Sequence, residues 1–222
     1  MKALGIVGSP RRGGNTELLM KLTLETIAEQ GIETELLSLA GKDIRPCTAC
    51  NACKSEEKCP IDDDLFPIYL KMKEADAIII GTPVYFQGPS ALVRAFIERA
   101  GYISNQHGRV FSGKVGGPLV VTRRSGMSLT HAQFLLWFSG QHFFIPGSNS
   151  VAIGRDKGEV LTDKEGVSIA REFGKSVAFL LTKLSKYPAD GFSHSHEKNV
   201  EEWTCPLFCA NRSGNSKRHR IL

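Results

Sequence analysis

Apolar and polar positions alternate along the chain in blocks that predict strands followed by helices. Short apolar runs typical of buried parallel strands are separated by longer segments in which apolar residues recur every three or four positions. The clearest strand is residues 76–81, and the clearest helical spacing follows residue 15. We expect strands at 3–8, 33–39, 76–81, 115–122 and 150–153, and helices at about 16–30, 64–73, 90–100, 129–139 and 164–185.

This order predicts an α/β fold of the flavodoxin-like, doubly wound type: a five-stranded parallel sheet with helices on both faces. Residues 1–187 are expected to form this domain and residues 188–222 an extension. In such sheets a ligand binds beyond the carboxyl ends of the strands, where the strand order reverses. Three loops follow strand ends, at 9–15, 82–88 and 122–127, and we expect them to meet.

The first of these loops has the composition of a phosphate site. It reads G-S-P-R-R-G-G-N-T over residues 8–16, so glycines, hydroxyls, an amide and arginines precede a helix N-terminus. Asn15 or Thr16 is expected to cap that helix. The Lys–Ser/Thr pair of a P-loop and the G-x-G-x-x-G fingerprint are both absent. A mononucleotide is therefore favoured over a triphosphate or a dinucleotide, and a plain glycine-rich turn is the alternative.

The second loop, T-P-V-Y-F-Q-G at 82–88, places two aromatic side chains and exposed backbone after the third strand. A flat flavin ring requires aromatic faces to pack against and peptide groups at its edge. Tyr85 and Phe86 would equally suit the core of the domain. Together with the phosphate loop, however, they favour a flavin mononucleotide.

Four cysteines lie within thirteen residues, in the order C-x2-C-x2-C-x5-C followed by proline: Cys47, Cys50, Cys53 and Cys59. In a chain without a secretory signal, such a group indicates metal binding rather than disulfides. The spacing is similar to the bacterial ferredoxin run, except that five residues instead of three precede the last cysteine. We predict a [4Fe–4S] cluster. Zinc, free thiols and a redox disulfide stay open as alternatives.

Charge and hydropathy restrict the possible partners. The last twelve residues supply +4 of the net charge of +5, and we interpret them as a solvated end rather than a nucleic-acid site. No stretch approaches the roughly 18 apolar residues that span a bilayer, and no signal peptide is evident, so a cytoplasmic location is expected. Cys205 and Cys209 are expected to be buried at a subunit contact. The aspartates at 62–64 are expected to begin a helix.

Three stretches, at 8–16, 82–85 and 90–91, resemble the NADPH-dependent FMN reductase group of flavodoxin-like proteins, and the similarity extends to about residue 186. It implies that FMN is the cofactor. The residues implied for the phosphate are Ser9, Arg11, Asn15 and Thr16, with Arg12 as a further candidate. Those implied for the ring are Pro83, Val84, Tyr85, Phe86 and Gln87, with Thr122 and Gly126 from the third loop.

The cysteine spacing, placed after the second strand of such a fold, resembles the iron–sulfur flavoprotein family. That resemblance implies a homo-oligomer that passes electrons between ferredoxin, a cluster on Cys47, Cys50, Cys53 and Cys59, and FMN. An NAD(P)H-dependent FMN or quinone reductase with structural cysteines is the alternative among enzymes. A flavin-free, zinc-stabilised binding module is a third hypothesis. No His or carboxylate pair is expected to be catalytic.

Overall fold

The computed structural model describes residues 1–147 and 150–186. The predicted extension at 188–222, with Cys205 and Cys209, lies outside the described residues. The strands are β1 (Lys2–Val7), β2 (Glu33–Ser38), β3 (Ala77–Tyr85), β4 (Gly88–Pro89), β5 (Val115–Thr122) and β6 (Val151–Ile153). The α-helices are α1 (Asn15–Ala28), α2 (Leu65–Glu74), α3 (Ala91–Gln106), α4 (Met127–Gly140) and α5 (Lys164–Leu184), and two short 3₁₀ turns are Ala52–Lys54 and Glu159–Thr162.

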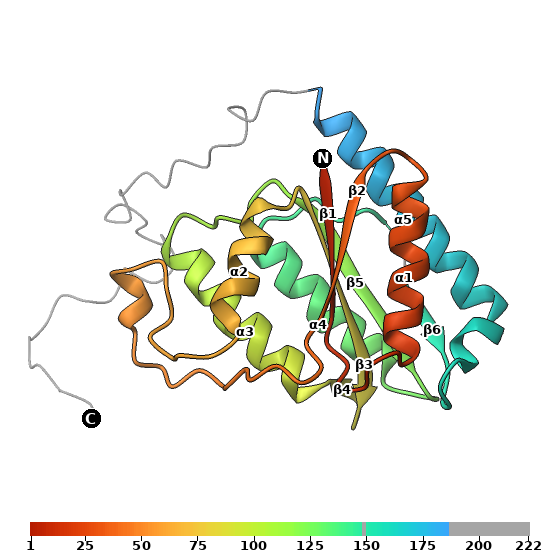
Figure 1. The fold of residues 1–222 in the computed structure, drawn as a ribbon, viewed down its shortest axis with the longest axis horizontal. Coiled ribbons are helices and arrows are strands. Elements are labelled where there is room, and N and C mark those ends of the chain that lie inside the picture. Colours follow the sequence, from red (N-terminus) through yellow and green to blue (C-terminus); the bar gives the residue numbers. More distant parts are fainter. Residues whose placement is uncertain (148–149, 187–222) are drawn as a thin grey trace, which may run out of the picture. The chain divides into compact units, whose positions relative to one another are not determined.

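The sheet has the strand order β2-β1-β3-β5-β6, and all of these neighbours run parallel. The chain therefore moves outward from β1 to β2, then crosses back to β3 on the other side of β1 (Figure 1). Strands β1 and β3 end beside each other, with Val7 opposite Gly81. The reversal of strand order lies between these two carboxyl ends, which is where an open α/β sheet binds its ligand.

The predicted fold class is confirmed, and one correction concerns the strands. There are six in the described part of the chain rather than five, because the segment predicted as a loop after the third strand is structured. Strand β3 continues to Tyr85, since its residues up to Pro83 still pair with β5. Val84 and Tyr85 then pair antiparallel with the two-residue strand β4. A hairpin thus replaces the predicted loop.

Two separate hydrophobic cores cover the two faces of the sheet, because successive side chains of a strand point to opposite sides. Leu4 and Ile78 face the core formed with α2, α3 and α4. Ala3 and Ile79, each one position away, face the core formed with α1 and α5. Figure 1 shows these two helical layers on either side of the strands. No helix of the described residues is long and apolar enough to cross a membrane.

Candidate functional site

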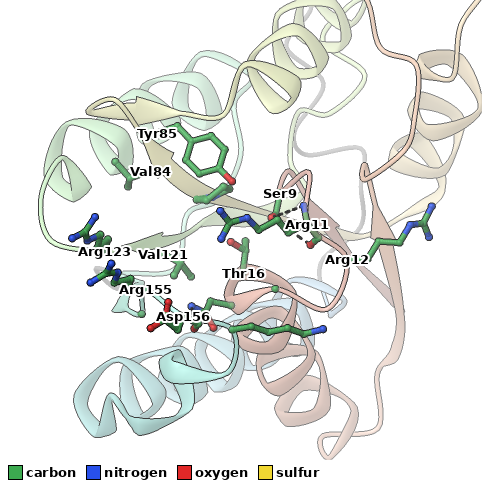
Figure 2. Close-up of a pocket in the computed structure, with 15 residues that line it drawn as sticks. Ser9, Arg11, Arg12, Thr16, Val84, Tyr85, Val121, Arg123, Arg155 and Asp156 are labelled. Carbon is green, nitrogen blue, oxygen red and sulfur yellow. Dashed lines mark hydrogen bonds between the residues drawn. The ribbon is translucent and has the colours of Figure 1, made fainter.

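A cleft of about 380 Å³ opens at the carboxyl ends of β1, β3 and β5 (Figure 2). The three predicted loops meet there, as expected, and a fourth loop after β6 completes the wall. Its volume is within the usual range of small-molecule sites, about 300–1,000 Å³. The lining residues are Ser9, Arg11, Arg12, Gly14, Asn15, Thr16, Pro83, Val84, Tyr85, Val121, Arg123, Gly154, Arg155, Asp156 and Lys157.

The phosphate loop is held in shape by short local hydrogen bonds. The buried Ser9 Oγ accepts the Arg11 N–H at 3.2 Å, and Thr16 is buried in the first turn of α1. The Glu17 carboxylate accepts the Gly13 N–H at 2.7 Å and pairs with Lys21 at 3.0 Å. Burial alone would raise the pKa of Glu17, but these two contacts hold it below the ordinary value. The loop therefore keeps its backbone donors at the helix N-terminus, where an anion is favoured.

The predicted helix cap is wrong. Helix α1 begins at Asn15 with Gly14 in the N-cap position, and no side chain caps it. Asn15 instead joins two loops: its amide donates to the Asp156 carbonyl at 2.8 Å, and its Oδ1 accepts the Gly158 N–H at 2.8 Å. Contacts in the tertiary structure explain why Asn15 does not cap the helix, because both of its partners are more than 140 residues away in sequence. Asn15 lines the cleft and also fixes the fourth loop to the first.

The two adjacent arginines have different surroundings. Figure 2 shows the Arg11 side chain directed into the cleft and that of Arg12 directed away from it. The Arg12 guanidinium donates to the Ala40 carbonyl at 2.9 Å. No hydrogen bond or ion pair of the Arg11 guanidinium is present among the described residues. Of the two, Arg11 is the one free to bind an anion in the cleft.

The tip of the β3–β4 hairpin is conformationally unusual. Phe86 and Gln87 both adopt positive φ, +47° and +69°, although neither is glycine. Two left-handed residues make the tight turn that the twist of a two-residue hairpin requires. The turn leaves Phe86 fully exposed and Tyr85 39% exposed, so neither aromatic belongs to the core. Strained backbone of this kind is concentrated at functional sites. Here it exposes the side chains of Tyr85 and Phe86 beside the cleft.

The third loop packs against this hairpin. Thr122 Oγ1 donates to the Ser125 carbonyl at 2.8 Å, and Gln87 Nε2 donates to Ser125 Oγ at 3.1 Å. Gly126 has φ +82°, and a Cβ there would lie 2.8 Å from the Gln87 Cα. Phe86, Gln87 and Thr122 line a second hollow next to the cleft, together with Arg123. Gly126 lines neither the cleft nor the second hollow. Because it has no Cβ, it allows the third loop to approach the hairpin closely.

All four clustered cysteines line one small cavity, whose other wall is helix α3. Cys53 and Cys59 are buried, whereas Cys50 is exposed, and all four are free thiols. Ala49 and Asn51, both with positive φ, turn the chain sharply between them. The four cysteines thus border one space, and their binding of a metal centre stays a prediction.

Helix α3 anchors the cysteine segment. Tyr102 Oη donates to Asn51 Oδ1 at 2.7 Å, and a ring nitrogen of His107 lies 2.9 Å from the Cys53 carbonyl. Within residues 1–147 and 150–186, no three His, Cys, Asp or Glu side chains are close enough to hold one metal ion.

Backbone and hydroxyl donors act on the sulfurs. The Ala49 N–H donates to Cys47 Sγ at 3.4 Å. The N–H of Ala52 and the hydroxyl of Thr48 lower the pKa of Cys50, because they stabilise its thiolate. Burial raises the pKa of Cys53. Donors to sulfur and partial burial are the features by which proteins tune thiolate-bound metal centres.

Comparison with known proteins identifies the family of the chain. The model of the NADPH-dependent FMN reductase family matches residues 1–158. An iron–sulfur flavoprotein of Methanocaldococcus jannaschii is 42% identical over 195 residues, covering 84% of this chain and 100% of the relative. An iron–sulfur flavoprotein of Methanosarcina thermophila is 32% identical over 188 residues, covering 84% and 98%. The chain belongs to the iron–sulfur flavoprotein family.

The resemblance stated from the sequence is thereby confirmed. Among solved structures, RosB with its bound intermediate 8-demethyl-8-formylriboflavin-5′-phosphate superposes with a TM-score of 0.71 at 18% identity, covering 85% of this chain and 81% of that one. An archaeal flavodoxin gives a TM-score of 0.56 at 14% identity, covering 82% and 99%. At these identities the likeness shows the fold alone, which for this member of the iron–sulfur flavoproteins is flavodoxin-like.

Sequence reasoning missed the fourth loop of the cleft. Arg155, Asp156 and Lys157 follow β6, and none of them was predicted, whereas Arg123 belongs to the predicted third loop. The signal was present, because the rule that ligands bind at the carboxyl ends of parallel strands applies to the last strand too. Strand β6 has only three residues, so its pattern in the sequence is weak and the loop that follows it is not conspicuous.

Proposed function

We propose that this chain is an electron-transfer protein that binds FMN in the cleft and a [4Fe–4S] cluster on Cys47, Cys50, Cys53 and Cys59. It passes electrons between a one-electron donor such as ferredoxin and FMN or a downstream acceptor. The observation that carries the proposal is the presence of two separate sites that share no side chain. One is the cleft at the carboxyl ends of the strands, and the other is the cavity that all four cysteines line.

The cleft suits FMN at both of its ends. The phosphate would lie at the N-terminus of α1 with Arg11 as counter-ion, because a helix N-terminus and a guanidinium both favour a dianion. The ring would lie against Val84 and Tyr85, which form the opposite wall. FMN supplies a ring that takes up one or two electrons.

The cysteine spacing suits a cluster better than zinc. Zinc sites usually use two well-separated C-x-x-C pairs. Cys47, Cys50 and Cys53 instead form two overlapping C-x-x-C steps. A four-iron cluster binds each cysteine to a different iron, so its ligands are spread more widely, and it supplies one-electron chemistry. A buried cation, Arg99, also lines the cavity, and its positive charge would favour an anionic group there.

Helix α3 connects the two sites rigidly. Ser90, its N-cap, donates to the carbonyl of Gly8, the first residue of the phosphate loop. Arg99, nine residues later, lines the cysteine cavity. At about 1.5 Å rise per residue these positions are about 14 Å apart along the axis. A protein that exchanges electrons between two centres benefits from a fixed separation of this kind.

A reductase that takes hydride from NAD(P)H, with structural cysteines, is the second candidate. One observation favours it: Arg123, Arg155 and Lys157 line the cleft in addition to Arg11. Several cations around one cleft suit the phosphates of a second nucleotide as well as that of FMN. The name of the matching family points the same way.

The visible spectrum and metal content of anaerobically purified protein test the cofactors. We expect flavin bands with a broad brown shoulder, and iron and sulfide in the protein. Cys47→Ala, Cys50→Ala, Cys53→Ala or Cys59→Ala should each remove the shoulder and leave the flavin bands, because the cysteines and the cleft share no side chain. Cys205→Ala is the matched control. Flavin bands alone in the wild type, or a colourless zinc protein, would contradict the proposal.

Stopped-flow mixing tests the direction of electron flow. Reduced ferredoxin should reduce the wild type, and a cluster-less Cys→Ala variant with FMN in place should lose this reaction. NADPH should be a poor donor. Fast, saturable reduction of the flavin by NADPH would promote the reductase alternative instead. A cytoplasmic location, a homo-oligomeric state and the absence of a nucleic-acid partner are part of the same proposal.

A further inference from the structure

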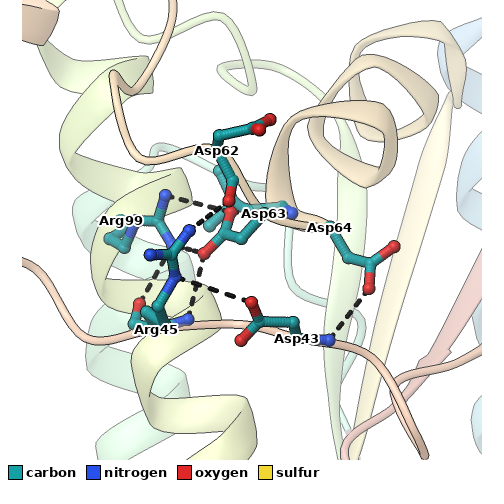
Figure 3. A network of polar contacts seen from close by, with 7 residues as sticks. Asp43, Arg45, Asp62, Asp63, Asp64 and Arg99 are labelled. Carbon is teal, nitrogen blue, oxygen red and sulfur yellow. Dashed lines mark hydrogen bonds and ion pairs between the residues drawn. The ribbon is translucent and has the colours of Figure 1, made fainter.

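A buried ion pair lies under the cysteine cavity, between α3 and the segment before α2 (Figure 3). The side chains of Arg99 and Asp63 are each 1% exposed. Both terminal nitrogens of the guanidinium face the carboxylate, with Nη2 donating to Oδ1 at 3.2 Å and Nη1 donating to Oδ2. Nη1 also donates to the Arg45 carbonyl at 2.9 Å. Three of the five N–H donors of Arg99 therefore bind protein oxygens.

Asp63 is well satisfied behind the arginine. Its Oδ2 accepts the Arg45 N–H at 3.0 Å and its Oδ1 the Leu65 N–H at 3.2 Å. Burial alone would raise the pKa of Asp63, but Arg99 and these N–H groups hold it below the ordinary value. The expectation that the aspartates begin a helix is met only in part. Asp64 takes the N-cap position of α2 without a capping bond, and its carboxylate accepts the Asp43 N–H instead.

Two N–H donors of Arg99 remain beyond these three bonds, one on Nη2 and one on Nε. Nε is buried and has no oxygen or nitrogen partner among the described residues, while the side chain lines the cavity with all four cysteines. Burial acts to lower the pKa of Arg99, but side-chain hydrogen bonds with Asp63 and Cys59 raise it overall. An unsatisfied buried donor costs free energy, which an acceptor in the cavity would recover.

A buried ion pair is weak evidence for stability, because well-packed apolar side chains usually serve the fold as well. The segment that contains Asp63 is also tied down independently, by Asp64 to the Asp43 N–H at 2.8 Å and to Lys42 at 3.0 Å. Stability of the fold therefore does not explain why the positive charge of Arg99 is buried beside this cavity. An anionic group among the four cysteines provides one.

We propose that Arg99, backed by Asp63, sets the reduction potential of the cluster, by holding its positive charge beside the group that the four cysteines bind. This inference rests on the proposed function. A four-iron cluster with four thiolates is anionic, and one-electron reduction by the donor adds one more negative charge. A nearby cation favours the reduced form and raises the potential, whereas the carboxylate behind it partly opposes this effect.

The two members of the pair should therefore shift the potential in opposite directions. Asp63→Asn keeps an acceptor oxygen but removes the opposing charge, so we expect a higher potential. Arg99→Gln removes the cation, so we expect a lower potential. Arg99→Lys keeps the charge and should remain nearest to the wild type. Arg94→Gln, on the same helix with Nη1 bonded to Gln133 at 3.1 Å and outside the cavity, is the matched control and should shift nothing.

The measurement is an anaerobic redox titration of the whole holoprotein followed by electron paramagnetic resonance, with iron and sulfide content determined for each variant. Opposite shifts in Asp63→Asn and Arg99→Gln support the inference. Unmoved potentials, or shifts in the same direction, overturn it. If Arg99→Gln does not load a cluster, Asp63→Asn alone decides by the sign of its shift. A wild type without iron and sulfide would instead refute the proposed function itself.

Discussion

At the scale of single residues, neighbouring side chains of one type have different roles in this protein. Arg11 and Arg12 are adjacent in sequence and equally charged, yet only Arg11 is directed into the cleft, since Arg12 binds the Ala40 carbonyl. The assignment of Ser9, Arg11, Arg12, Asn15 and Thr16 to the phosphate of FMN stays a prediction. The geometry nevertheless ranks its members, because a donor that already has a protein partner gains less from a ligand.

Arg11→Ala should therefore weaken FMN binding more than Arg12→Ala. The first change removes a charge-assisted bond to a dianion, worth roughly 1.5–3 kcal/mol, or about 10- to 150-fold in Kd. The second should cost mainly the contact with Ala40. Fluorescence titration of the apoprotein with FMN measures both constants. Equal losses, or a larger loss for Arg12→Ala, would place the phosphate elsewhere in the cleft.

At the scale of elements, the N-terminus of α3 joins a stabilising cap to the binding loop. The buried Ser90 Oγ accepts the Val93 N–H at 3.3 Å and donates to the Gly8 carbonyl. The Ser90 N–H in turn donates to Thr82 Oγ1 at 3.2 Å. Gly8 is required here, because a Cβ would lie 2.4 Å from the Val93 Cβ. One serine thus holds the helix, β1 and β3 together where the cleft begins.

Ser90→Ala should lower the free energy of unfolding by roughly 1–2 kcal/mol, as expected for loss of a helix cap, and should also weaken FMN binding. Asp163→Ala is the matched control, since Asp163 caps α5 by accepting the Gly166 N–H at 3.0 Å and lies outside the cleft. Urea unfolding and FMN titration separate the two effects. Equal loss of FMN affinity in both variants would show that Ser90 acts through stability alone.

At the scale of the whole molecule, ion pairs connect the sheet to the helical layer. Glu35 on β2 contacts Lys2 on β1 at 2.7 Å and Lys71 on α2. These two lysines, Lys2 first, hold the pKa of Glu35 below its ordinary value in spite of partial burial. A carboxyl group whose pKa is lowered by folding stabilises the protein above its unfolded-state pKa. That contribution is lost as the pH falls through the folded-state pKa.

Glu35→Gln should consequently reduce the difference in thermal stability between pH 7 and pH 3.5. The wild type loses this contribution progressively once the pH falls below the unfolded-state pKa of a glutamate, whereas the variant has none to lose. Glu33→Gln is the matched control, because Glu33 is on the same strand but 71% exposed, and its oxygen lies 3.9 Å from Lys2. Thermal melts at both pH values measure the effect. Parallel losses in all three proteins would contradict it.

Much of the architecture was determined by the sequence alone. The alternation of strands and helices and the flavodoxin-like class both follow from local patterns. Such patterns are readable because the burial of a strand or helix repeats with a fixed period along the chain. The cysteines at 47–59 are likewise close in sequence, so their meeting in space needed little from the rest of the fold. The family resemblance drew on the same local motifs.

Only the tertiary structure decided which side chains face which partner. Asn15 bonds to residues of the fourth loop instead of its own helix, and Arg99 finds Asp63 thirty-six residues away. The hairpin at Phe86 and Gln87 was likewise hidden, because neither residue is typical of a left-handed turn and the pairing with β4 imposes it. Contacts between distant segments depend on how the layers pack, and no periodic pattern along the chain records them.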